Sequence, residues 1–146
     1  MSDLRTEQAA REAESWAAFA GALERIPRER WEEEGILPGW SVKELLWHMA
    51  GWLQKCARNL ERFARGEDEL ASEQTVDERN EELAAQAHGM TIDAVYRGLM
   101  SARELVVDGW NALPNVDELA VEELAGETYD HYDEHRADLE RFSAPA

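Results

Sequence analysis

The chain is poor in the residues that mark disulfide-bonded or membrane-spanning proteins. Cys56 is the single cysteine among 146 residues, so an internal disulfide is excluded and a reducing compartment is favoured. Its apolar neighbours predict a small core side chain, and a reactive thiol is the alternative. No apolar run approaches the roughly 18 residues that a membrane span needs, and the first residues, MSDLRTEQAAREAESW, lack the apolar segment of a signal peptide. We therefore expect a cytoplasmic protein.

Basic residues are also scarce, and lysine is represented only by Lys43 and Lys55. Fifteen Lys and Arg stand against 32 Asp and Glu, which gives a net charge of −17. A phosphate backbone or an anionic membrane surface would be repelled by such a chain, so neither is an expected partner. The acidic residues are spread along the chain, a distribution typical of solvated helix faces.

The four prolines and nine glycines cluster at a few places, and the segments between them have a helical period. No alternating strand pattern is present, and Gly35, Pro38 and Gly39 predict an irregular loop after Pro27. Ser41 and Glu44 predict a capping box. Helices are predicted over residues 4–26, 41–65, about 75 to a pause at 87–91, 92–112, and from 118 or 121 to 142.

The four longer segments each have one apolar stripe, which predicts that they pack around a common core. The expected fold is all-α: one domain over residues 1–146, an antiparallel four-helix bundle with a short extra helix before the third long one.

The last predicted helix has two histidines on its apolar face. The face contains Leu124, Thr128, His131, His135, Leu139 and Phe142, at spacings of four, three, four, four and three residues. Imidazoles at i and i+4 on a helix can share one metal ion. Two histidines hydrogen-bonded at the edge of the core, without a metal, are the alternative.

A third histidine, His48, borders the apolar stripe of the second predicted helix. If the second and last helices are neighbours, His48, His131 and His135 converge on one point, as in metal sites of bundle cores. Three imidazoles leave a coordination position free, the pattern of a catalytic zinc site. His88 lies beside Gly89 in a predicted turn and is expected to be exposed.

Two stretches carry a resemblance to a known family. GWSVKELLWHMAGW (residues 39–52) followed far downstream by YDHYDEHRADL (residues 129–139) resembles the DinB-like superfamily of bacterial four-helix-bundle proteins. This superfamily includes metal-dependent thiol S-transferases and the mycothiol-dependent maleylpyruvate isomerases. The matching positions are Trp40, Ser41, Glu44, Leu45, His48, His131 and His135. The segment from residue 75 to 106 resembles the family's third helix, and this likeness places Asp77 and Asn80 at the mouth of the site.

The resemblance implies a divalent metal, zinc or nickel, on His48, His131 and His135, a small-molecule substrate and a homodimer. A low-molecular-weight thiol is a further implied cofactor. An anionic thiol would need basic groups nearby, for which Arg58, Arg62, Arg79 and Arg97 are the candidates. Trp40, Trp47 and Trp52 are candidates for the pocket wall. No catalytic residue is assigned from the sequence.

Three functional hypotheses remain from the sequence. The first is a metal-dependent enzyme that activates a thiol or water, of the thiol S-transferase or hydrolase type. The second is a non-catalytic protein that binds a small molecule or protects against one. In the third, the histidines only satisfy hydrogen bonds at the core edge.

Overall fold

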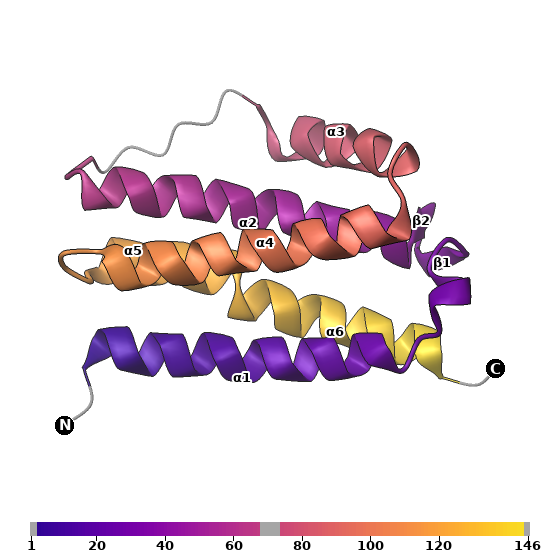
Figure 1. Cartoon of the computed structure of the whole chain (residues 1–146), viewed down its shortest axis with the longest axis horizontal. Coiled ribbons are helices and arrows are strands. Elements are labelled where there is room, and N and C mark those ends of the chain that lie inside the picture. The colour runs from indigo at the N-terminus through magenta and orange to yellow at the C-terminus, as the bar shows by residue number, and fades with distance from the viewer. Residues whose placement is uncertain (1–2, 68–73, 145–146) are drawn as a thin grey trace.

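The computed structural model describes residues 3–67 and 74–144, which form a bundle of helices with one short hairpin (Figure 1). The elements are α1 (Leu4–Glu24), a 3₁₀ turn (Arg28–Arg30), β1 (Glu34–Leu37), β2 (Trp40–Ser41), α2 (Val42–Ala64), α3 (Val76–His88), α4 (Ile92–Ala112), α5 (Glu118–Glu127) and α6 (Tyr129–Ser143). The predicted all-α bundle is confirmed. Among the described residues, no helix combines the length and apolar character needed to cross a bilayer.

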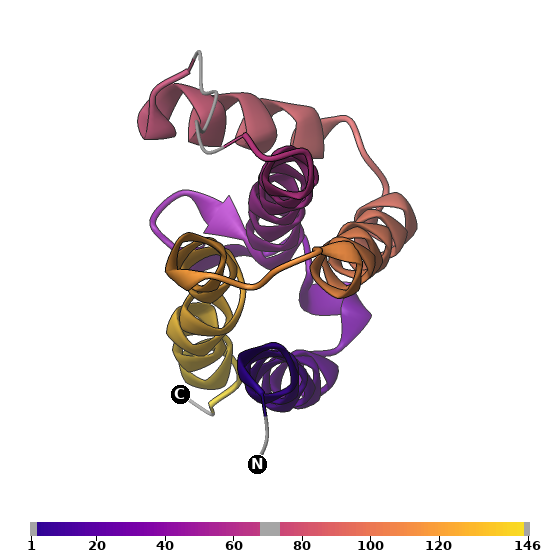
Figure 2. The ribbon, with the colours of Figure 1, turned by 90° about the vertical axis from the view of Figure 1, so that its left-hand side faces the viewer.

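The helices of the bundle run in two opposite directions. α1 and the α5–α6 pair run one way, while α2 and α4 run the other way (Figure 1). The end-on view shows α3 outside the four-helix core, beside α2 (Figure 2). Gly51 favours the close approach of α3, because a Cβ there would collide with the Leu83 side chain and force it to shift. The short extra helix before the third long one is thus present and packs on the surface of α2.

The start of α2 is defined by the predicted capping box. The Ser41 hydroxyl accepts a hydrogen bond from the Glu44 backbone N–H at 3.3 Å, and Glu44 Oε1 accepts from the Ser41 N–H at 3.2 Å. Both bonds satisfy donors that a helix start would otherwise leave unpaired. The first turns of α2 therefore have a fixed position, and His48 lies in the second of them.

The core runs along the whole bundle and includes Cys56 in α2. Phe19, Leu45, Leu53 and Leu99 are fully buried in the same cluster. Cys56 is also fully buried, and its burial raises the pKa of the thiol well above its usual value. The predicted role as a core side chain is therefore confirmed, and a buried thiol of this kind is unreactive.

The last helix is not continuous, which corrects the prediction of one helix to residue 142. Thr128 has φ −116° and ψ −95°, and it separates α5 from α6. Its hydroxyl and its backbone N–H both donate to the Leu124 carbonyl, at 2.6 Å and 2.9 Å. A hydroxyl that bonds back to the preceding turn favours a bend, and Gly126 weakens the helix just before it. The histidines thus lie on a short helix of their own.

Residues 27–40 are more ordered than the predicted loop. β1 and β2 pair antiparallel around a turn in which Gly39 has φ +78° after Pro38. A proline followed by a left-handed glycine is the preferred sequence of a tight turn. With strands of four and two residues, no alternation is visible in the sequence. The hairpin places the Trp40 ring 5.0 Å from the His48 ring, centroid to centroid.

Candidate metal centre

Three imidazoles from two helices meet at one point between α2 and α6. His131 Nε2 lies 3.0 Å from His48 Nε2 and 3.0 Å from His135 Nε2. His48 and His135 are buried, and His131 is half-buried. The 83 residues that separate His48 from His131 in sequence are bridged because α2 packs beside the α5–α6 pair. The structure thus brings together the three histidines that the bundle arrangement predicts as neighbours.

The spacing of these nitrogens suits a single small cation. Zinc–imidazole bonds of about 2.0–2.1 Å in a tetrahedral arrangement place ligand nitrogens about 3.3 Å apart. The observed separations of 3.0 Å are within a few tenths of an ångström of that value. One ligand atom from each histidine lies within 4.8 Å of those of the other two. The cluster is therefore compatible with a metal site, and a set of imidazoles suits zinc or nickel.

Burial keeps two of the three histidines neutral near pH 7. It lowers the pKa of His48 to about 4, with a further decrease from His135 and an opposing effect of Asn80. It lowers the pKa of His131 to about 3, again with contributions from His135 and then His48. Neutral imidazoles have the free lone pair that a metal ion requires.

His135 is oriented by a carboxylate. Its Nδ1 lies 2.9 Å from Asp138 Oδ2. Because a carboxylate accepts only, Nδ1 donates the proton and Nε2 keeps its lone pair toward His131. Arg141 Nη2 donates to the other Asp138 oxygen at 2.8 Å and to the Ile36 carbonyl at 3.2 Å. This chain of bonds connects the histidine to β1 and has the arrangement that orients metal-ligating histidines in general.

The histidines lie in the wall of a cavity of about 420 Å³. The cavity is lined by Leu37, Trp40, His48, Trp52, Val76, Asn80, Gly126, Glu127, His131, Glu134 and His135. Asn80 Oδ1 accepts a hydrogen bond from Trp52 Nε1 at 2.8 Å, which holds the indole in place. The second ring nitrogen of His48, Nδ1, is buried and has no hydrogen-bond partner within the described ranges. A small molecule in this cavity would lie against the imidazoles and the two indoles.

Two carboxylates in the cavity were not predicted from the sequence. Glu127 Oε1 lies 4.0 Å from Lys55 Nζ, while its Oε2 is buried without a hydrogen-bond partner in the described part of the chain. Burial raises the pKa of Glu127 to about 7, although Lys55 opposes that shift. Glu134 is exposed at the rim. The one sequence feature that could have indicated Glu127 is its position, four residues before His131.

Of the other residues discussed for the site, some line the cavity and some lie outside it. The His88 side chain is 72% exposed and lies outside the cavity, as predicted. Asn80 lines the cavity, whereas Asp77 is exposed and is not among the lining residues. Of the tryptophans, Trp40 and Trp52 line the cavity, while Trp47 does not and donates instead to Gln86 Oε1 at 2.9 Å.

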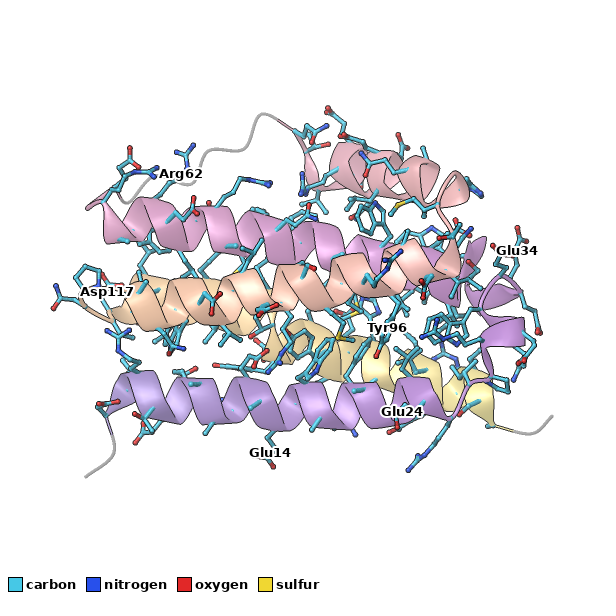
Figure 3. The ribbon with its side chains drawn as sticks, viewed as in Figure 1. Glu14, Glu24, Glu34, Arg62, Tyr96 and Asp117 are labelled. Atoms are coloured by element: carbon cyan, nitrogen blue, oxygen red, sulfur yellow. The ribbon has the colours of Figure 1, made fainter. Side chains whose placement is uncertain are left out.

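None of the four candidate arginines lines the cavity. Arg62 points away from the bundle (Figure 3). Arg79 Nη2 donates to the Gly51 carbonyl at 2.7 Å. Arg58, Arg62 and Arg79 lie on α2 and α3, which also contribute residues to the cavity wall, whereas Arg97 lies on α4, which contributes none.

The fold and the cluster define a helical-bundle protein with a three-histidine group compatible with a metal ion. The chain matches the family model of the mycothiol maleylpyruvate isomerase N-terminal domain over residues 12–121. It therefore belongs to that family, within the DinB-like superfamily that the two sequence stretches resemble. The match includes His48 and ends before His131. No curated protein and no solved structure matched the chain.

Proposed function

We propose that this protein is a metal-dependent enzyme that activates a thiol or water, of the thiol S-transferase or hydrolase type. His48, His131 and His135 would hold a divalent ion, zinc or nickel. The observation that supports this most is the convergence of three Nε2 atoms beside an open cavity. Membership of a family named for a thiol-dependent isomerase adds support for a thiol as the activated group. The homodimer that the resemblance implies stays a prediction.

The chemistry follows from the groups around the cavity. A divalent ion on the imidazoles would act as a Lewis acid that lowers the pKa of a bound thiol or water. The two indoles make part of the cavity wall apolar, and an apolar wall strengthens electrostatic interactions beside it. Glu127, whose pKa is about 7, is able to accept and return a proton near neutral pH. Asp138 keeps the His135 lone pair directed at the cluster.

Two measurements on the intact protein test this proposal. Elemental analysis after purification without a metal-binding affinity tag should find about one divalent ion per chain. Turnover is then measured with a panel of thiols and electrophilic substrates, with metal-loaded protein compared against chelated protein. The proposal predicts turnover that depends on metal and is lost in His131→Ala. Absence of bound metal, or equal turnover in the chelated protein, would contradict it.

A second candidate function is non-catalytic binding of a small molecule. The 420 Å³ cavity with Trp40 and Trp52 in its wall favours this alternative. Binding would quench or shift tryptophan fluorescence, because the ligand contacts the indoles. Ligand affinity that is unchanged when all three histidines are replaced by alanine would favour this function over the enzyme.

A further inference from the structure

The side chains that line the cavity have charges of one sign. Glu127 and Glu134 are acidic, and the lining contains no lysine or arginine among the residues that the structure describes. A negatively charged group in this cavity would therefore lie near two acidic side chains, with no basic side chain among the described lining residues to offset them.

Two basic groups close to the cavity, Lys55 and Arg79, already have partners within the protein. Lys55 Nζ lies 3.9 Å from Glu123 Oε1 and 4.0 Å from Glu127 Oε1, so two carboxylates share its charge. The Arg79 guanidinium donates to the Gly51 carbonyl and lies 5.6 Å from the Trp52 ring. Glu82 and Glu127 both interact favourably with the Arg79 charge. Neither cation is free to turn toward an anionic ligand.

The two carboxylates of the cavity do have capacity for a cation. Glu127 Oε2 is buried and unpaired, and Glu134 makes no ion pair with the other described residues. A buried carboxylate oxygen without a partner is costly, so a ligand that supplies positive charge there is favoured. The Trp40 ring adds a face that attracts cations, whereas the Trp52 ring already has Lys55 Nζ 5.3 Å from its centroid.

From these observations we infer that the site selects a thiol that has a cationic group and disfavours a thiol that has a carboxylate. This inference rests on the proposed function, in which the thiol sulfur binds a metal ion on the histidines. The positive group of the ligand then lies with Glu127 and Glu134 at the wall and rim. The net charge of −17 acts in the same direction over longer distances.

Three thiols of similar size, each with a different charge, test the inference. Thiocholine is cationic and cannot chelate through its quaternary nitrogen, 2-mercaptoethanol is neutral, and 3-mercaptopropionate is anionic. The protein is loaded with Co²⁺, and each thiol is titrated at pH 8, where Glu127 is ionised, while the sulfur-to-cobalt charge-transfer absorption is recorded. The apparent Kd values give the ratio of affinity for thiocholine to affinity for 3-mercaptopropionate.

The three thiols differ in intrinsic acidity, so the informative quantity is the change of this ratio between variants. The double variant Glu127→Gln, Glu134→Gln removes both carboxylates and retains similar side-chain shapes. We expect the ratio to decrease by about two- to fivefold, the effect of one favourable ion pair near a surface. The matched control is Glu81→Gln, Glu122→Gln, which makes the same change in net charge at exposed positions outside the cavity. The control should keep the wild-type ratio.

The possible failures are distinguishable. If the charge-transfer band forms but the ratio is unchanged in the cavity variant, or falls equally in the control, charge selection by Glu127 and Glu134 is wrong and the metal–thiol proposal stands. If cobalt binds and no thiol gives the band, the proposed thiol activation is wrong, and the inference fails with it. Circular dichroism of each variant confirms that the comparison is made between folded proteins.

Discussion

At the scale of single residues, Asp138 is the side chain that orients the His135 ring within the cluster. It accepts from His135 Nδ1 and is itself held by Arg141. An imidazole without this partner is free to rotate and to exchange tautomers, so its lone pair would not stay directed at the other two nitrogens. The carboxylate is thus expected to act on metal affinity without contacting the metal.

This role predicts the effect of Asp138→Ala. The variant should bind Zn²⁺ about 10–100 times more weakly, the usual loss when such a supporting partner is removed. A competition titration against a chromophoric chelator measures the change. Asp130→Ala is the control, because Asp130 is on the same helix and exposed. Equal affinities for the Asp138 variant and the wild type would show that Asp138 does not position the ligand.

The Glu127 carboxyl predicts a pH-dependent change in stability. Its pKa is about 7 in the folded protein, above the ordinary glutamate value of 4.5. Between pH 4.5 and 7, the folded state therefore keeps a proton on Glu127 that the unfolded state has already released. The free energy of unfolding decreases as pH rises through this window. In metal-free protein, Glu127→Gln should raise the free energy of unfolding by about 2 kcal/mol at pH 8.

The same substitution should have little effect at low pH, where the glutamate is already protonated. Urea unfolding of wild type and variant at pH 4.5 and pH 8 gives the comparison. Identical differences at the two pH values would mean that the carboxyl titrates normally in the folded protein.

Sequence reasoning at the residue scale succeeded where the signal was local spacing. His131 and His135 share a helix face because they are four residues apart, and His48 borders the stripe of its own helix. Glu127 and Asp138 differ from the many other acidic residues only in what they contact after folding. That distinction depends on the packing of α5 and α6 against α2, which no single segment encodes.

At the scale of elements, α6 is connected to the bundle by a buried polar network. Glu12 of α1, whose side chain is 5% exposed, accepts two bonds from Arg103 of α4, at 2.7 Å and 2.9 Å. Tyr132 of α6 donates to the same carboxylate at 2.9 Å. Three helices thus share one acidic group, and the network fixes the orientation of the turn that carries His131.

Removal of the shared carboxylate should destabilise the fold. Glu12→Ala leaves a partly buried guanidinium without its partner, a change that costs about 3 kcal/mol. Urea unfolding measures the loss. Glu14→Ala is the control, because Glu14 points away from the bundle (Figure 3) and exposed substitutions cost about 0.5 kcal/mol or less. Similar losses in the two variants would argue that the network contributes nothing specific.

The elements themselves were predictable where caps and periodicity coincide. The capping box of α2 and the ends of α3 and α4 follow from side chains within one turn of each boundary. The break at Thr128 and the β1–β2 hairpin were not predicted. The first depends on a single hydroxyl that bonds back to Leu124, and the second on strands too short to show a period.

At the scale of the whole molecule, the bundle follows from one apolar stripe on each long helix. The sequence could not state which helices are neighbours, because stripes of similar width are interchangeable. In the structure, α2 packs against α4 and α1 packs against α6, while α3 lies outside the four-helix core beside α2. The three-histidine cluster is a consequence of that arrangement, since His48 reaches His131 only when α2 lies beside the α5–α6 pair.

The central claim is that His48, His131 and His135 bind one metal ion together, and the metal-dependent increase in melting temperature tests it directly. At about 100 times its Kd, Zn²⁺ adds about 2.7 kcal/mol to the free energy of unfolding, which corresponds to an increase of roughly 5–10 °C for a chain of this size. The wild type and the control His88→Ala should both show this increase. His131→Ala, His135→Ala and His48→Ala should each lose most of it. Full metal-dependent stabilisation of His48→Ala, together with its loss in His131→Ala, would contradict a three-histidine site.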